Sequence, residues 1–158
     1  MRKLVATALM LAFSSLASAA PDRAASAEEA ATALAQWQSA FNACDTEQLT
    51  ALYAPQALFW ATTATAPITS TEGVRAYYKA FCAGPVKLQM QAEASAIRTF
   101  GGTATAIGSA TASYTVQDQP KSFKLRFTLT VQNLDGVTRI VEHHSSMLPA
   151  APAKPAAN

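Results

Sequence analysis

The hydrophobic period of this chain changes once, at Val86, and this change limits the folds that the chain can adopt. Before Val86, apolar residues recur every three or four positions, which is the period of an amphipathic helix. After Val86, apolar and polar residues alternate, which is the period of a strand with one buried face. Because helices and strands are segregated along the chain, the sequence predicts an α+β domain and not a series of βαβ units.

Three helices are expected before the change of period. The first extends over residues 26–44, with its first serine as the cap and with apolar residues at helical spacing. The second is a short helix that Asp45 caps and that stops at Pro55. The third is capped by Thr71 and ends at Gly84.

Five strands are expected, of which the first is short and covers residues 57–60. Four long strands follow from Val86, with turn signals at residues 101–102, 118–120 and 133–136. The second and fourth of these long strands are expected over residues 103–116 and 137–147. Three N-terminal helices packed on one face of a strongly curved antiparallel sheet would give the domain the shape of a cone.

The N-terminus has the pattern of a secretory signal peptide. Two basic residues precede an apolar run, and Ala17-Ser18-Ala19 is a small-residue cleavage site. The run is too short for a permanent span, although an uncleaved N-terminal anchor remains the alternative. We therefore expect a signal peptide over residues 1–20, a secreted or periplasmic domain over residues 25–149, and a disordered Ala/Pro-rich tail over residues 150–158.

Charge argues against two classes of partner. The chain has 12 Lys and Arg against 10 Asp and Glu, and two of the basic residues, Arg2 and Lys3, lie in the leader. Without them the mature protein has ten basic and ten acidic residues, with no excess of either sign. Nucleic-acid binding would need a basic patch, and binding to a membrane surface after signal cleavage would need a basic amphipathic helix, so neither is expected.

The two cysteines, Cys44 and Cys82, are expected to form a disulfide. Export favours oxidation, and two thiols allow one intramolecular pairing. The alternatives are two free buried thiols or a catalytic thiol. A catalytic thiol needs an activating base and a polar setting, whereas Cys44 continues the apolar face of the first helix.

The last expected strand holds both histidines of the chain, His143 and His144. Adjacent residues of a strand point to opposite faces. Since a zinc site usually needs three or four ligands, no metal site is expected. In one interpretation, one histidine lies at the surface and the other is hydrogen-bonded in the interior. In the other, His144 lines a pocket as a ligand-binding or acid/base group.

Arg126 lies on the polar side of an alternating strand. With His144 it would give a fixed cation and a titratable group for an anionic ligand. The alternative is a solvent-facing arginine that pairs with an acid such as Glu142 on the next strand.

Residues 140–149, IVEHHSSMLP, are similar to a terminal IVxHHSSxxP motif, and residues 52–54 and 73–78 resemble earlier segments of the same family. The chain thus resembles the nuclear transport factor 2-like or SnoaL-like superfamily. Within it, the resemblance is to the calcium/calmodulin-dependent protein kinase II association domain and to the bacterial SgcJ/EcaC family. Thr138 departs from the pattern, because the family usually has a tryptophan there.

This resemblance implies a sheet curled around a pocket. By position, Arg126 and His144 would face a cavity that accepts small carboxylates, and Trp60 and Tyr78 would line its wall. The resemblance also implies a homodimer or a higher homo-oligomer. No GxGxxG turn, flavin motif or metal cluster is present in the sequence, so no cofactor is expected and the oxidoreductase label of the SgcJ/EcaC family lacks a visible carrier of electrons.

Three hypotheses of function follow. The preferred one is an exported, self-associating domain that binds a small anionic molecule. The second is a cofactor-independent enzyme of the isomerase, cyclase or dehydratase type, with His144 as general acid/base and Arg126 stabilising an enolate. The third is a purely structural oligomerisation module.

Overall fold

The computed structural model describes residues 23–149, so the expected signal peptide and the expected C-terminal tail lie outside the described residues. Three helices and five strands follow one another in this part of the chain: α1 (Ala27–Ala43), α2 (Thr46–Ala51), β1 (Tyr53–Trp60), α3 (Thr71–Ala83), β2 (Gln89–Phe100), β3 (Thr103–Val116), β4 (Gln119–Leu134) and β5 (Val137–Met147). None of these helices is long and apolar enough to cross a membrane.

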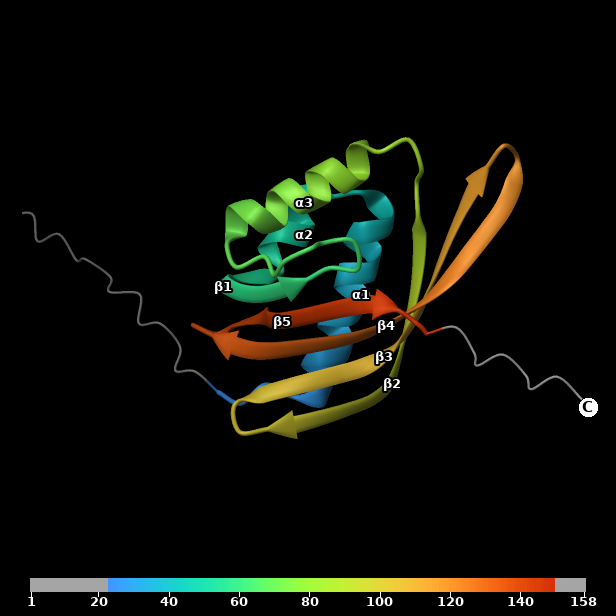
Figure 1. The fold of residues 1–158 in the computed structure, drawn as a ribbon. Helices are drawn as coiled ribbons and strands as arrows, with labels where there is room; N and C mark the ends of the chain where they lie inside the picture. The colour runs from blue at the N-terminus through green and yellow to red at the C-terminus, as the bar shows by residue number, and fades with distance from the viewer. Residues whose placement is uncertain (1–22, 150–158) are drawn as a thin grey trace, which may run out of the picture.

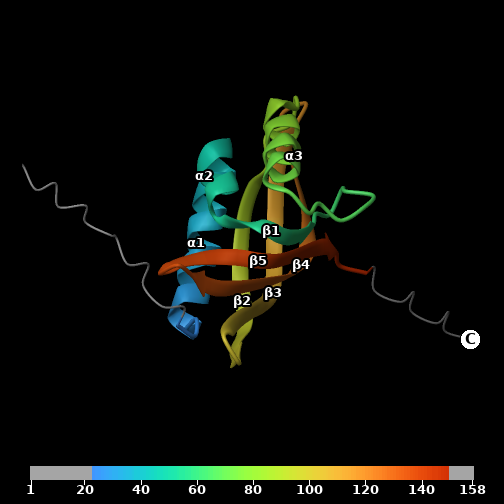
Figure 2. The ribbon, with the colours of Figure 1, turned by 90° about the vertical axis from the view of Figure 1, so that its left-hand side faces the viewer.

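The strands form one curved, unclosed sheet in the order β1-β5-β4-β3-β2. Strands β2 to β5 pair as the expected antiparallel meander. Strand β1 pairs with β5 in the parallel direction, so the sheet is mixed and not wholly antiparallel. The helices lie on one side of the sheet: α1 crosses behind the strands in Figure 1, and α3 packs over β1 and α2 (Figures 1 and 2). The α+β prediction is confirmed.

Several element boundaries differ from those expected. Strand β1 begins at Tyr53 and not at residue 57, and β2 begins at Gln89 and not at Val86. Helix α2 ends at Ala51 and not at Pro55. The amide of Ile140 on β5 donates a hydrogen bond to the carbonyl of its C-cap residue, Leu52, at 2.8 Å, and the chain then enters β1. Pro55 then lies in an edge strand with an irregular register, a position that tolerates proline. Ser70, not Thr71, caps α3, since its hydroxyl accepts a hydrogen bond from the amide of Gly73 at 3.1 Å.

The first helix matches its prediction closely. Ser26 caps α1 and forms a capping box with Glu29, which satisfies two amides that the helix leaves unpaired. Its apolar face is buried against the sheet through Ala30, Leu34, Trp37 and Phe41.

Alternation gives the sheet an apolar inner face and a polar outer face. On β4, the side chains of Leu125, Phe127 and Leu129 are buried, whereas Arg126 is exposed. Leu129 is paired with His143 on β5, so the two side chains share the inner face. One histidine is therefore built into the apolar layer that the helices cover.

Candidate functional site

A small cavity lies between the helices and the inner face of the sheet. Its volume is about 70 Å³, and its lining is mainly aromatic and aliphatic. The side chains come from α1, β1 and the loop after it, α3 and strands β2 to β5, and they include Trp37, Phe59, Phe81, Met90, Phe123 and Phe127. Among the described residues, no Asp, Glu, Lys or Arg borders this cavity. Its chemistry is therefore that of an uncharged, apolar pocket with few polar groups.

His143 is the titratable imidazole of this cavity. It is 2% exposed, stacks on the ring of Phe59 with centroids 5.2 Å apart, and meets the edge of Trp37 at 5.1 Å. Burial, with the nearby charge of His144, lowers the pKa of His143 to about 3. His143 is therefore a neutral imidazole at neutral pH.

A chain of hydrogen bonds runs from α1 through α3 and β1 to this histidine. The indole Nε1 of Trp37 donates to the hydroxyl of Tyr78 at 2.8 Å. The hydroxyls of Tyr78 and Tyr53 are 2.7 Å apart, and the Tyr53 hydroxyl is 2.7 Å from Nδ1 of His143. Burial raises the pKa of both tyrosines, so both hydroxyls keep their protons.

The rim of the cavity adds further hydroxyls. Thr62 donates to Ser145 at 3.0 Å, and the hydroxyls of Thr63 and Tyr77 are also 3.0 Å apart. Ser145 lies two residues beyond His143 on the same strand and borders the same cavity. These rim hydroxyls come from β5, the loop after β1 and helix α3.

The four residues predicted to bind a ligand do not lie together. Tyr78 borders the interior cavity. Arg126 and His144 lie on the outer face, where both border one shallow depression, and the ring of Trp60 is 6.4 Å from that of His144. The expectation that His144 would line the interior pocket is corrected, because the pairing of Leu129 with His143 turns His143 inward.

Arg126 has a neutral partner in the structure. Its Nε donates to the hydroxyl of Ser146 at 3.0 Å, on the strand that also carries Glu142. The depression that it shares with His144 also includes Ser109 and Thr128. This outer site is open and includes the charged side chain of Arg126, in contrast to the cavity beneath the sheet.

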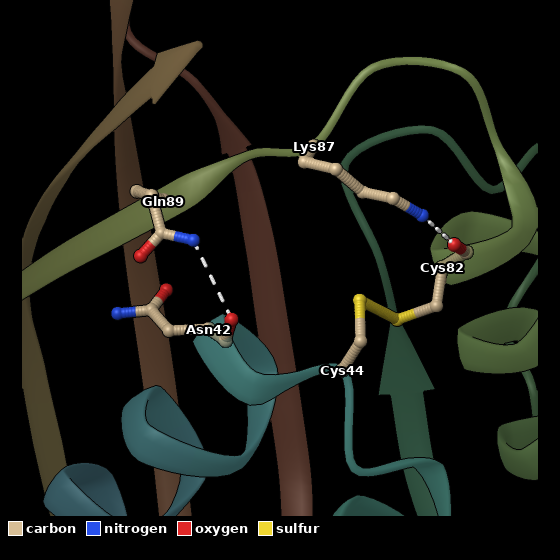
Figure 3. Close-up of a disulfide and its surroundings, with 5 residues drawn as sticks. All are labelled: Asn42, Cys44, Cys82, Lys87 and Gln89. Carbon is tan, nitrogen blue, oxygen red and sulfur yellow. Dashed lines mark hydrogen bonds between the residues drawn. A yellow bond between two sulfur atoms is a disulfide. The ribbon is translucent and has the colours of Figure 1, made fainter.

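The Cys44–Cys82 disulfide is present, as expected, and joins the end of α1 to the end of α3 (Figure 3). The two Cα atoms are 5.7 Å apart. Lys87 donates a hydrogen bond to the carbonyl of Cys82, which ties the chain after α3 to the same corner (Figure 3). Helix α3 provides Tyr77, Tyr78 and Phe81 to the cavity, so this bond holds one wall of the site.

Tyr53, a residue of the candidate site, was assigned to the end of a helix. The interpretation with one histidine at the surface and the other hydrogen-bonded in the interior fits the structure, but the sequence did not single out His143 as the inner one. The signal for an inner histidine was the alternation of β4 and β5, which puts one of two adjacent histidines inside. Within the described residues, no group of three or more His, Cys, Asp or Glu could hold a metal ion.

Helices that cover one face of a curved, unclosed sheet, with a cavity between the two layers, define a nuclear transport factor 2-like fold. The chain belongs to the SnoaL-like domain family, whose sequence profile matches residues 30–151. The resemblance read from the terminal histidine motif is confirmed. A search of curated proteins found no match.

Solved structures show the same fold at low identity. A protein of Xanthomonas campestris named for the calcium/calmodulin-dependent protein kinase II association domain is 24% identical, with a TM-score of 0.67 over 83% of this chain and 97% of that one. A ketosteroid isomerase-like protein of Erwinia carotovora atroseptica is 12% identical, with a TM-score of 0.68 over 78% of this chain and 96% of the other. An NTF2-like protein of Novosphingobium aromaticivorans is 17% identical, with a TM-score of 0.67 over 80% and 84%.

Proposed function

We propose that this protein binds a small, uncharged and mainly apolar molecule in the cavity that contains His143. The observation that carries the proposal is a neutral, buried imidazole in a lining that has no charged side chain among the described residues. Ligand sites are commonly apolar pockets in which a few polar groups fix the orientation of the ligand. His143 and the rim hydroxyls are such groups.

The lining favours binding over turnover. An enzyme that abstracts a proton needs a base within reach of the substrate and with a pKa near the working pH. In the described cavity no carboxylate is present, and Nδ1 of His143 is already in contact with Tyr53. The enzyme hypothesis with His144 and Arg126 would have to use the outer depression, which is open to water.

A comparison of the binding of a neutral probe with that of an anionic probe tests this proposal. Acetophenone and benzoate are similar in size, and we expect acetophenone alone to bind in the cavity, as seen by ligand-observed NMR. In Ala110→Leu, which adds bulk to the cavity lining, binding of acetophenone is expected to disappear, and in Arg126→Ala it is expected to persist.

The same experiment tests the second candidate, an anion site on the outer face. Arg126 and His144 border one depression, which supports a site for a small carboxylate. Binding of benzoate that is lost in Arg126→Ala, with no response to acetophenone, would favour that candidate and count against the interior site.

We also propose that the domain is exported and self-associates through the outer face of its sheet. Residues Trp60, His144, Thr128 and Ile107 form one registered row across four strands, and Trp60 and Ile107 are 48% and 47% exposed. We expect residues 21–158 to sediment as a dimer and Trp60→Glu to sediment as a monomer. Phe100→Glu, at the exposed end of β2, is the control that keeps the dimer, and a monomeric parent protein would contradict the proposal.

A further inference from the structure

The buried hydrogen-bond chain that ends at His143 has a direction. An indole nitrogen only donates, so the hydroxyl oxygen of Tyr78 must accept from Trp37. The Tyr78 hydroxyl can then donate its one proton in a hydrogen bond to the Tyr53 oxygen, which is 2.7 Å away. The Tyr53 hydroxyl can in turn donate a hydrogen bond to Nδ1 of His143.

The opposite direction would leave a buried proton without an acceptor. If Nδ1 of His143 donated to Tyr53 and Tyr53 donated to Tyr78, the Tyr78 oxygen would accept twice and its own proton would have no partner among the described residues. Tyr78 is 1% exposed, and an unsatisfied buried donor is strongly disfavoured. If Nδ1 and Tyr78 both donated to Tyr53, the proton of Tyr53 would lack an acceptor in the same way. The direction from Trp37 to His143 gives every hydroxyl and indole proton of the chain an acceptor, and only the Nε2 proton of His143 has none among the described residues.

We infer that Trp37, Tyr78 and Tyr53 fix His143 as the tautomer with its proton on Nε2, so that the cavity offers the ligand one buried hydrogen-bond donor. The inference rests on the proposed function and names its ligand class: apolar molecules with a hydrogen-bond acceptor, such as a carbonyl, ether or ring-nitrogen atom, at the buried end. Tyr53 is thus a positioning residue, because it acts on the ligand through His143.

The contacts of the imidazole support this class of ligand. Nδ1 is occupied by Tyr53, and no second partner of the imidazole occurs within residues 23–149, which leaves Nε2 to the cavity that the ring borders. The ring itself is held by Phe59 and Trp37 on two sides, so it cannot easily turn over. A carboxylate would also accept a hydrogen bond from Nε2 of His143, but its charge would have no counter-ion in the cavity.

Nitrogen chemical shifts measure the tautomer without any ligand. The chain has two histidines, so a His144→Gln variant assigns the signals of His143. We expect a protonated Nε2 and an unprotonated Nδ1 in the parent protein. A protonated Nδ1 would overturn the inference, whether or not the protein binds anything.

A matched pair of tyrosine variants tests the role of the chain. In Tyr53→Phe the tautomer is no longer enforced, and we expect the shifts of both ring nitrogens to move toward an average of the two forms. In Tyr77→Phe, which removes a hydroxyl that contacts Thr63 and not His143, the shifts are expected to stay unchanged. If Tyr53→Phe does not fold, the shifts of the parent protein still decide the tautomer.

Two neutral isosteres test the acceptor preference. Acetophenone has a carbonyl oxygen where α-methylstyrene has a methylene group, and we expect acetophenone to bind about fivefold more tightly, a ratio typical of one neutral hydrogen bond. The preference should fall in Tyr53→Phe and persist in Tyr114→Phe, which removes a hydroxyl outside the cavity lining. Equal binding of both compounds would overturn the acceptor class and leave the proposed function intact. Binding of neither would overturn the proposed function and the acceptor class together, while the tautomer is still decided by the nitrogen shifts.

Discussion

Removal of the Cys44–Cys82 disulfide is expected to lower the free energy of unfolding by about 4 kcal/mol. The bond joins residues 38 positions apart, and the chain-entropy model assigns about this value to a loop of that length. A domain of this size has a total stability of roughly 5–15 kcal/mol, so the loss is a large part of the whole. Denaturant unfolding of Cys44→Ala/Cys82→Ala against the parent protein measures it.

Reduction provides the control for the two substitutions. A reducing agent should lower the stability of the parent protein to that of the double variant and should leave the variant unchanged. Because α3 is tied to the end of α1 by this bond and carries Tyr78 and Phe81 of the cavity, amide exchange is expected to accelerate most in α3. A double variant as stable as the parent protein would contradict the prediction.

The architecture could be predicted well because it depends on local patterns. The change of period at Val86 separated helices from strands, and the bounds of β3 and β5 agree with the expected residues 103–116 and 137–147. Ser26 was identified as a cap from residue type and position. Two cysteines permit one pairing, so the disulfide needed no knowledge of the fold.

The errors have a common origin in contacts between distant segments. At the end of α2, Ile140 donates a hydrogen bond to Leu52, and no pattern within residues 45–55 signals that bond. Sequence shows that His143 and His144 point to opposite faces, but it does not show which of them points inward. That choice depends on the register of β5 against β4, which includes an irregularity between Thr130 and Val131 and is not visible in either strand alone.

The hydrogen-bond chain to His143 was beyond sequence analysis for the same reason. Its members lie on α1, β1, α3 and β5, and the indole of Trp37 reaches a tyrosine 41 residues away. Tyrosine and tryptophan in apolar positions predict burial, and buried hydroxyls predict partners, but the identity of each partner comes only from the packing of four elements.

Acid is expected to destabilise this protein through His143, by about 2 kcal/mol between about pH 8 and about pH 5. The ordinary pKa of histidine is 6.5, and burial lowers that of His143 to about 3. Between these values the unfolded chain takes up a proton that the native protein excludes, so stability is highest above pH 6.5 and falls as the pH decreases toward 3. The titratable groups that face this imidazole, Tyr53 and its neighbour Tyr78, stay neutral throughout this range because burial raises the pKa of both.

The pH range separates this effect from that of Glu29. Hydrogen bonds from Arg23, Ser26 and Thr138 lower the pKa of Glu29 from its ordinary 4.5, so its stabilising effect is present above pH 4.5 and is lost only as the pH falls further. Denaturant unfolding at several pH values above 5 therefore reports mainly on His143.

In His143→Phe, which keeps an aromatic ring against Phe59, the slope of stability with pH is expected to vanish even if the variant is less stable overall. In His144→Gln the slope is expected to remain, because that side chain is exposed on the outer face. A slope that disappears in His144→Gln and persists in His143→Phe would show that the inner histidine is not the one that titrates on unfolding.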